Sequence, residues 1–509
     1  MIFNKTREAF IVKEKGKRVA ESLALALEQR MKKQKDRLEL RSETEPEAPR
    51  RSTATVETRG YLLRTGGHSG KKLPPGSLGF PLIGESISFI KAHKHNKTVD
   101  WIQDHVNKYG PVFKSSLMGS NAVLLIGQAG NRFIFSGKDN GIASNQVGTA
   151  AGILGKHSIF ELPGPRHKIV RGAIMSFLKP EAIQRIVSAM DSLVQQELFQ
   201  VGCSLLFRLP ESKEKDELFE DFIVAIKGLW ALPLKFPGTA YHKALQARGR
   251  ICRLLSKLIK ERKKEIEARS IGLEDNINDL ISSLLMLRNE NDEPLLEEEI
   301  IDNFIAVMIA SHDTTSVFLS YFMIQLTRDT EVFEKVLQEQ KEVAKAIEGK
   351  DGKFMTWSEI QMMKHTWRVG QELLRLNPPV FGNFKCAKRD INFDGYDIPK
   401  GWKVFWFAAG THMDEKIFND PDKFDPGRFE VSSKLLPPYT YIPFGAGPRI
   451  CPGAEYAKIE ALLIIHHLIM NYQWTAMIPD EPILRDPMAY PAMGLPVKLQ
   501  KRSFHHAND

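Results

Sequence analysis

The sequence predicts a mainly α-helical fold with a few small β-sheets. Helical spacing of apolar residues dominates from about residue 97 to 475, and its longest stretch, Glu297 to Arg328, would give about nine turns of helix. Short β signals gather in three places, which are Val112 to Leu125, Ile391 to Phe407 and the C-terminal tail. No internal repeat stands out. We therefore expect an α+β fold in which helices supply most of the structure.

The bulk composition is that of a globular protein. The chain has 509 residues, of which 42% are hydrophobic and 26% charged, so it can bury a large core without covalent staples. Its 4 cysteines are scattered and form no CxxC pair. A disulfide framework and a structural zinc site are therefore not indicated, and a reducing compartment is favoured. A cysteine in a special setting then becomes a candidate for chemistry.

The net charge of +9 is compatible with an acidic partner or a lipid surface, and equally with a mildly basic soluble surface. No basic run is interleaved with aromatic residues, so we do not expect nucleic-acid binding.

Residues 1–70 differ from the rest because they are rich in charged residues and end in a Ser/Thr/Gly stretch. Within them, Arg18 to Arg41 has helical character, and Leu23, Leu27 and Met31 would share one face. We interpret this as a solvated amphipathic helix followed by a disordered linker; peripheral membrane contact is the alternative. The apolar runs there are far shorter than the ~20 residues that span a membrane, and they lack the order of a signal peptide.

A segment dense in Pro and Gly, Lys71 to Gly84, marks the expected domain boundary. Such a run cannot be helical and predicts a semi-rigid lead-in. We thus divide the chain into a charged N-terminal extension, 1–70, and a main folded domain, 71–509.

The strongest local feature is the glycine-rich segment Pro443 to Gly453. Its glycines let the backbone turn tightly and approach a flat ligand, and a helix is expected from Ala454 to Met470. Cys451 would lie just before that helix, with Arg449 two residues away, and both features favour a thiolate. A sheltered thiolate suits iron ligation. The alternative is a buried structural cysteine in a tight turn.

The spacing Phe-x-x-Gly-x-Arg-x-Cys-x-Gly, from Phe444 to Gly453, resembles the haem-binding signature of the cytochrome P-450 superfamily. The resemblance implies the fold of that family, with a long central helix over haem b. It also implies that Cys451 is the proximal iron ligand and that Arg449 pairs with a haem propionate. Thiolate ligation pushes electron density onto the iron and favours O–O cleavage.

The middle of the long helix carries an unusual polar run, Ala310 to Thr315. Ser, Asp and Thr are poor residues for a helix interior, so a kink or an exposed polar patch is the structural alternative. The run resembles the oxygen-binding groove of the family. By that resemblance Thr314 holds activated oxygen through a hydrogen bond, Asp313 relays protons as a general acid, and Ala310 leaves room beside the haem. Ser311 replaces the usual glycine and would narrow the groove slightly.

Two further pairs lie at helical spacing. Glu372 and Arg375, at i and i+3, can form an ordinary surface ion pair. The resemblance implies instead a buried structural network of these two residues with Arg428, which fixes the cysteine loop. His167 and Arg171, at i and i+4, point the same way and resemble the pair that grips a haem propionate.

A departure from the family is Lys385, because many relatives carry Arg at that position. Lys cannot offer a bidentate fork, so we treat it only as a candidate propionate contact.

The segments Pro74 to Glu85 and Phe236 to Thr239 resemble those of the plant clan that oxidises steroids and terpenoids. Resemblance to the family covers about residues 71–500. It implies a monooxygenase that inserts one oxygen atom from O2 into a hydrophobic isoprenoid substrate. Electrons would come from NADPH through NADPH–cytochrome P-450 reductase, docked on a basic face near Cys451.

Two other functions remain open from the residues alone. One is a haem-thiolate isomerase or dehydratase that needs no reductase; the acid–alcohol pair Asp313–Thr314 argues against it. The other is a non-catalytic haem-binding protein. By resemblance we expect the cytosolic face of the endoplasmic reticulum membrane, although no transmembrane anchor is visible in the sequence.

Overall fold

A computed structural model gives the architecture of the chain. It describes residues 70–80, 83–136, 141–196, 213–269, 279–289, 291–348, 354–430, 436–485 and 487–502. The predicted N-terminal helix, Arg18 to Arg41, and nearly all of the extension lie outside the described residues.

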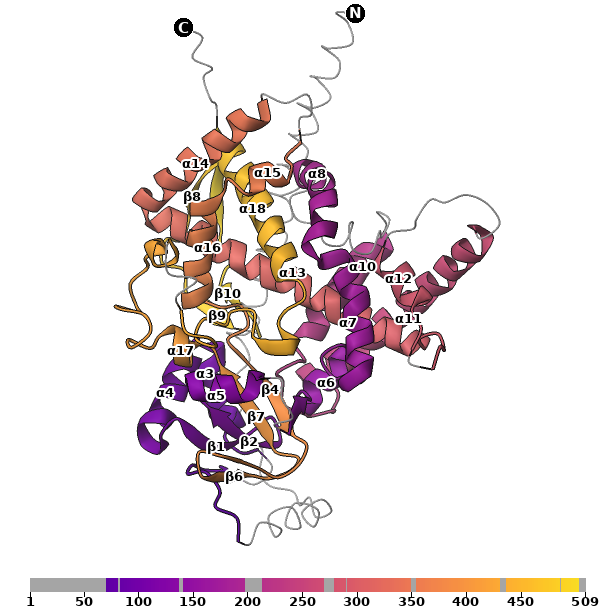
Figure 1. Cartoon of the computed structure of the whole chain (residues 1–509), viewed down its shortest axis with the longest axis vertical. Helices are drawn as coiled ribbons and strands as arrows, with labels where there is room; N and C mark the ends of the chain where they lie inside the picture. The colour runs from indigo at the N-terminus through magenta and orange to yellow at the C-terminus, as the bar shows by residue number, and fades with distance from the viewer. Residues whose placement is uncertain are drawn as a thin grey trace, which may run out of the picture.

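The molecule combines a large helical region with a smaller β-rich region (Figure 1). The bounds of the helices are α3 Ser86–Lys94, α4 Thr98–Tyr109, α5 Gln128–Phe135, α6 Gly148–Leu154, α7 Gly164–Leu178, α8 Pro180–Gln196, α10 Lys213–Ile226, α11 Ala240–Arg269, α12 Leu280–Met286, α13 Glu297–Arg328, α14 Thr330–Glu348, α15 Trp357–Ile360, α16 Lys364–Leu376, α17 Ala409–His412 and α18 Ala454–Asn471, with short 3-10 turns at Pro426–Phe429 and Gly447–Arg449.

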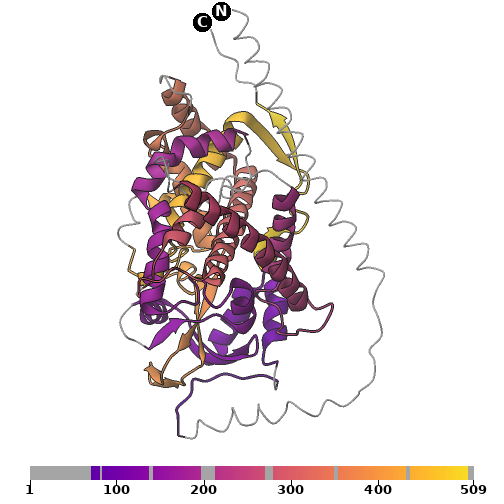
Figure 2. The same cartoon turned by 90° about the vertical axis from the view of Figure 1, so that its right-hand side faces the viewer.

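A five-stranded sheet dominates the β-rich region, in the order β1-β2-β7-β4-β3. Its strands are β1 Val112–Leu117, β2 Ser120–Leu125, β3 Ile142–Ser144, β4 Gly382–Ala387 and β7 Lys403–Phe407. The hairpin β1–β2 closes on Met118 and Gly119, whose positive φ values of 51 and 74 fit the twist of a two-residue turn. The parallel pairing of β2 with β7 brings early and late parts of the chain side by side (Figure 2).

Three two-stranded ribbons complete the β structure. They are β5 Ile391–Phe393 with β6 Tyr396–Ile398, β8 Tyr472–Ala476 with β11 Val497–Lys501, and β9 Ile483–Arg485 with β10 Ala489–Pro491.

The central helix α13 runs through the interior, where it contacts α6, α11, α14, α16, α18 and β10. Glu299 reaches back to accept a hydrogen bond from the Leu296 backbone N–H at 2.9 Å, and acidic residues fill the first turn, where the helix dipole favours negative charge. Most of its residues are buried. The helix is therefore held by packing along its length rather than by one amphipathic face.

The predicted fold class is confirmed, and the predicted bounds of the long helix agree with α13. The three β clusters are also present. β3 and β4 were not predicted, because short strands in loop-rich segments carry little periodicity. In the part of the chain that the structure describes, no helix is long and apolar enough to cross a membrane.

Candidate active site

The cysteine segment folds as a tight loop ahead of α18. The Cys451 backbone N–H donates to the Phe444 carbonyl at 3.0 Å, and α18 begins three residues later, at Ala454. Gly447 has a positive φ of 69, and a Cβ there would lie 2.0 Å from the Phe135 carbonyl oxygen. Only glycine fits at that position. The loop thus presents Cys451 from a backbone that packs directly on α5.

The Cys451 side chain is solvent-accessible although protein atoms crowd it, as expected on a concave wall. Burial raises the pKa of the Cys451 thiol, and the Gly453 backbone N–H and the charge of Arg171 only partly oppose the rise. The prediction that the helix end and Arg449 favour a thiolate is therefore wrong in the net direction of the shift. Burial outweighs the Gly453 backbone N–H at the start of α18, and the charge that lowers the pKa is that of Arg171 on α7.

The polar run of α13 lies on the same side of the molecule as α18. Thr315 donates to Glu460 of α18 at 3.3 Å, which ties the run to the helix that follows Cys451. Ala310 is exposed although its neighbours toward the helix N-terminus are buried. Thr314 donates to the Ala310 carbonyl at 2.6 Å. Ala310 thus forms an accessible position on α13, a helix whose other residues are mostly buried.

Asp313 is buried and pairs with the ring of His312, whose Nδ1 lies 2.9 Å from Asp313 Oδ1. Ser311 donates to the Met308 carbonyl at 3.3 Å. Its hydroxyl therefore folds back on its own helix.

Cationic side chains from three elements gather near the cysteine loop. Burial, followed by the charges of Arg449, Arg171 and Lys385, lowers the pKa of His167 to about 4. Burial and Arg449 lower the pKa of Lys385 to about 8, while Glu161 opposes that change. These mutual effects show that α7, β4 and the 3-10 turn bring their cations close together.

Among the residues that the structure describes, two of these cations bond only to neutral groups. The Arg449 guanidinium donates to the carbonyls of Ile159 and Leu162, at 3.3 and 2.6 Å. The Lys385 ammonium lies 3.2 Å from the Ser144 hydroxyl. Their charges are therefore available to an anion.

These features fit haem. Positive charge exceeds nearby negative charge, which suits a group with two carboxylates. Cys451 and Ala310 are both exposed, and the Thr315–Glu460 hydrogen bond joins the helix of Ala310 to the helix that follows Cys451, which suits a flat macrocycle with a sulfur ligand.

The predicted three-residue network is present. Arg375 donates to both carboxylate oxygens of Glu372 at 2.7 Å, and Arg428 donates to the same carboxylate at 3.2 Å. Glu372 and Arg375 have 0% exposure. They form a buried, charge-assisted cluster rather than a surface pair.

His412 connects that network to the cysteine loop. Its Nδ1 lies 3.0 Å from the Arg375 carbonyl, and its Nε2 accepts from the Ile442 backbone N–H at 2.9 Å. Burial lowers the pKa of His412 to about 3, so the ring is neutral. Sequence reasoning missed His412 and Glu460, because a lone buried polar residue leaves no periodic signal.

A small apolar cavity lies between α10 and α13, with a volume of only about 10 Å³. It is lined by Phe219, Phe222, Ile223, Ile226, Met308, Ile309 and His312. At about 100° per residue, Met308 and His312 lie on the opposite face of α13 from Ala310 and Thr314. This cavity is therefore separate from the Cys451 side.

Comparisons with known proteins agree with this geometry. The sequence model of the cytochrome P-450 family matches residues 187–499. The chain is 37% identical to taxoid 14-beta-hydroxylase of Taxus cuspidata, over 87% of this chain and 90% of that protein. It is 34% identical to beta-amyrin 28-monooxygenase of Vitis vinifera, over 87% of this chain and 96% of that protein. Among solved structures, retinoic acid-bound cyanobacterial CYP120A1 superposes with a TM-score of 0.75 and 29% identity, covering 85% of this chain and 100% of that one.

Proposed function

This chain is a monooxygenase of the cytochrome P-450 family, and from that premise we propose that it hydroxylates a terpenoid with electrons that NADPH supplies through a reductase. Relatives at 34–37% identity include hydroxylases of taxoids and a monooxygenase of beta-amyrin. The observation that carries the proposal is the accessible thiol of Cys451 among unmatched cations, beside the polar run of α13.

We assign the haem-binding residues from this arrangement. Cys451 is the iron ligand, Phe444 packs beside it, and Ala310 leaves space on the opposite wall. Four side chains serve the propionates, and they are Arg449, Arg171, His167 and Lys385. When bound, the haem supplies the activation of O2 that a thiolate ligand promotes.

Thr314 and Asp313 handle oxygen and protons in this proposal. The Thr314 hydroxyl now bonds to a carbonyl of its own helix and can turn from that weak local bond toward dioxygen. The Asp313 carboxyl, paired with the half-exposed His312, passes protons from solvent to the site. The Glu372–Arg375–Arg428 network is structural and holds the loop that presents Cys451.

The reductase and the location follow from the family and not from the geometry. A flavoprotein reductase would dock on the basic face near Cys451, and the enzyme would work at the cytosolic face of the endoplasmic reticulum membrane.

The spectrum of the reduced holoprotein with carbon monoxide tests the proposal. We expect the red-shifted Soret band of a thiolate-bound haem, and its loss in Cys451→Ala. Cys252→Ala, which removes a cysteine of α11, is the matched control and should keep the band. A histidine-type spectrum in the wild type would refute the assignment. Turnover that needs neither NADPH nor reductase would favour the isomerase or dehydratase alternative.

A further inference from the structure

Arg485, at the end of β9, is a buried cation with no counter-ion among the described residues. It is 6% exposed, and its Nε donates to Asn96 Oδ1 at 2.6 Å. Its guanidinium lies 5.4 Å from the ring centre of Phe381. Within the described part of the chain no carboxylate pairs with it, and its Nη1 atom has no hydrogen-bond partner. Buried charges in proteins are normally paired, so this arrangement points to a missing ligand.

Tyr321 of α13 is a second buried group with an unused polar atom. Its side chain is 8% exposed and its hydroxyl has no partner among the described residues. The charge of Arg485 acts on Tyr321 and partly offsets the rise that burial causes in the pKa of the phenol, which shows that the two groups are near each other. Two independent donors are thus unsatisfied in one region.

His93 lies beside them but cannot supply the missing partner. Its Nδ1 is 3.2 Å from the Thr98 hydroxyl and its Nε2 is 2.8 Å from the Pro487 carbonyl. Burial, and then the charge of Arg485, lowers the pKa of His93 to about 4, so the ring is neutral. The imidazole instead anchors the turn that joins β9 to β10.

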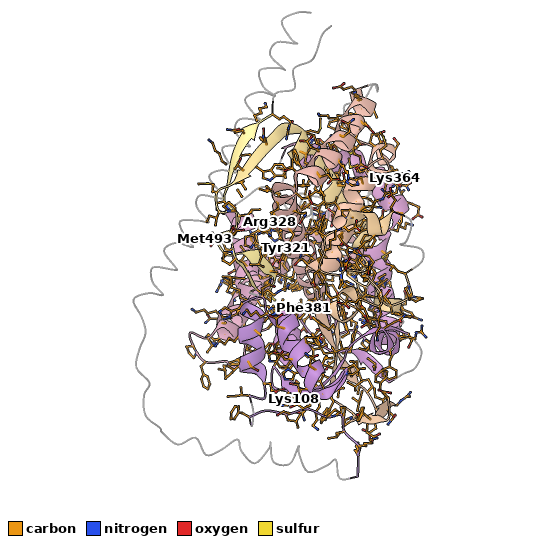
Figure 3. All side chains as sticks on the ribbon, turned by 90° about the vertical axis from the view of Figure 1, so that its left-hand side faces the viewer. Lys108, Tyr321, Arg328, Lys364, Phe381 and Met493 are labelled. Carbon is orange, nitrogen blue, oxygen red and sulfur yellow. The ribbon has the colours of Figure 1, made fainter. Side chains whose placement is uncertain are left out.

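The position of this region relative to Thr314 suits a substrate contact. Tyr321 follows Thr314 by seven residues, which places it on the same face of α13 and about 10 Å along the helix axis. The walls are apolar and aromatic, since Trp230 packs on both His93 and Phe381. Figure 3 labels Tyr321 and Phe381 in the interior, near the β9–β10 hairpin.

We propose that Arg485 and Tyr321 bind the carboxylate of an isoprenoid acid, at the end of the substrate that is remote from the oxidised carbon. The inference rests on the proposed function and deepens it. A neutral hydroxyl or ketone would leave the guanidinium uncompensated, whereas a carboxylate matches both its charge and its fork of donors. Both atoms without partners are closed to solvent, so side chains around them must move to admit the acid.

Retinoic acid and retinol form a matched pair of probes, because they share a carbon skeleton and differ in the carboxylate. Spectral titration of the holoprotein should show about 10- to 100-fold tighter binding of the acid, the range for a charged hydrogen bond. Arg485→Met should remove that preference and leave the affinity for retinol unchanged. Arg328→Met is the matched control, since it removes an exposed guanidinium at the end of α13, the helix that carries Tyr321 (Figure 3). It should change neither affinity.

Thermal unfolding of the ligand-free holoprotein separates a ligand-binding arginine from a structural one. Arg485→Met should melt at the same temperature as the wild type or higher, because it removes an uncompensated buried charge. A lower melting temperature with equal loss of both ligands would overturn the proposal. If Arg485→Met does not fold, Tyr321→Phe decides. It should weaken retinoic acid binding several-fold without lowering the melting temperature, and unchanged binding would overturn the proposal.

Two results distinguish a failure of the carboxylate site from a failure of the proposed monooxygenase function. A wild type with the thiolate carbon monoxide spectrum that binds acid and alcohol equally would refute only the carboxylate site. A wild type without that spectrum would refute the monooxygenase assignment itself.

Asp486 lies outside the described residues, and Asp486→Asn should keep the preference for the acid. If that variant melts lower and binds retinoic acid more tightly, Asp486 is the counter-ion and the proposal fails.

Discussion

Two buried arginines of this protein stand in opposite situations. Arg375 is fully buried, and its donors reach both oxygens of Glu372 and the His412 carbonyl, at 2.7 to 2.8 Å. Arg485 is nearly as buried but has one hydrogen bond, no carboxylate among the described residues and one unused nitrogen. A guanidinium cannot discharge itself, because its proton is retained far above neutral pH.

The difference separates structure from recognition. The cost of burying Arg375 is offset within the fold, and the residue is linked through His412 to the backbone of Ile442, ahead of the cysteine segment. The cost of burying Arg485 is not offset within the described fold, which is what a site awaiting an anion requires. Both arginines are buried, so the feature that distinguishes the structural Arg375 from the proposed ligand-binding Arg485 is whether the guanidinium has hydrogen-bond and charge partners.

The largest loss of stability is expected when Arg375 loses its counter-ion and so comes to resemble Arg485. Glu372→Gln keeps the shape of the side chain but leaves Arg375 without a counter-charge. We expect the free energy of unfolding to fall by about 3–5 kcal/mol, measured by denaturant titration of the holoprotein. A loss below about 1 kcal/mol would show that burial alone does not demand pairing at this site.

Glu460 extends the comparison to a buried acidic group. Unlike a guanidinium, a carboxyl group that lacks a counter-ion can become neutral by binding a proton. Burial raises the pKa of Glu460 to about 7, and the Thr315 hydroxyl only partly opposes the rise. Between the ordinary value of 4.5 and about pH 7, the folded state keeps a proton that the unfolded state has lost. The free energy of unfolding should therefore fall as pH rises through that window, by roughly 3 kcal/mol in total.

Glu460→Gln should remove this slope. Stability curves of the variant and the wild type, measured by denaturant titration from pH 4 to 8, should lie close together near pH 4 and diverge in favour of the variant above pH 7. Parallel curves would show that folding does not shift the pKa of Glu460.

The smallest change in the free energy of unfolding should come from breaking a surface ion pair whose length is similar to that of the Glu372–Arg375 pair. Arg368 donates to Glu430 at 2.8 Å, but the two side chains are 25% and 60% exposed. Arg368→Ala should cost less than about 1 kcal/mol by the same titration, because water and salt screen exposed charges. A loss as large as that of Glu372→Gln would mean that distance, and not burial, sets the energy of these pairs.

Much of the fold and part of the site could be predicted from the sequence. The bounds of α13 follow from the spacing of its apolar residues, and the start of α18 follows from the glycine at the end of the cysteine segment. The Glu372–Arg375 contact is also local, because residues at i and i+3 share a helix face. The link to Arg428, and the depth at which all three are buried, needed a resemblance to known proteins.

The sequence by itself determined where the long central helix and the helix after the cysteine segment run, and which cysteine is the ligand candidate; the family resemblance then named the candidate acid and alcohol. Turn geometry and helical spacing depend on residues within about four positions, so they can be read from the chain. The tertiary structure alone decided that cations from α7, β4 and the 3-10 turn meet at one place, that burial raises the pKa of Cys451, and that Arg485 and Tyr321 share an unsatisfied region. Those properties depend on desolvation and on charges far apart in the sequence, which become neighbours only when the chain folds.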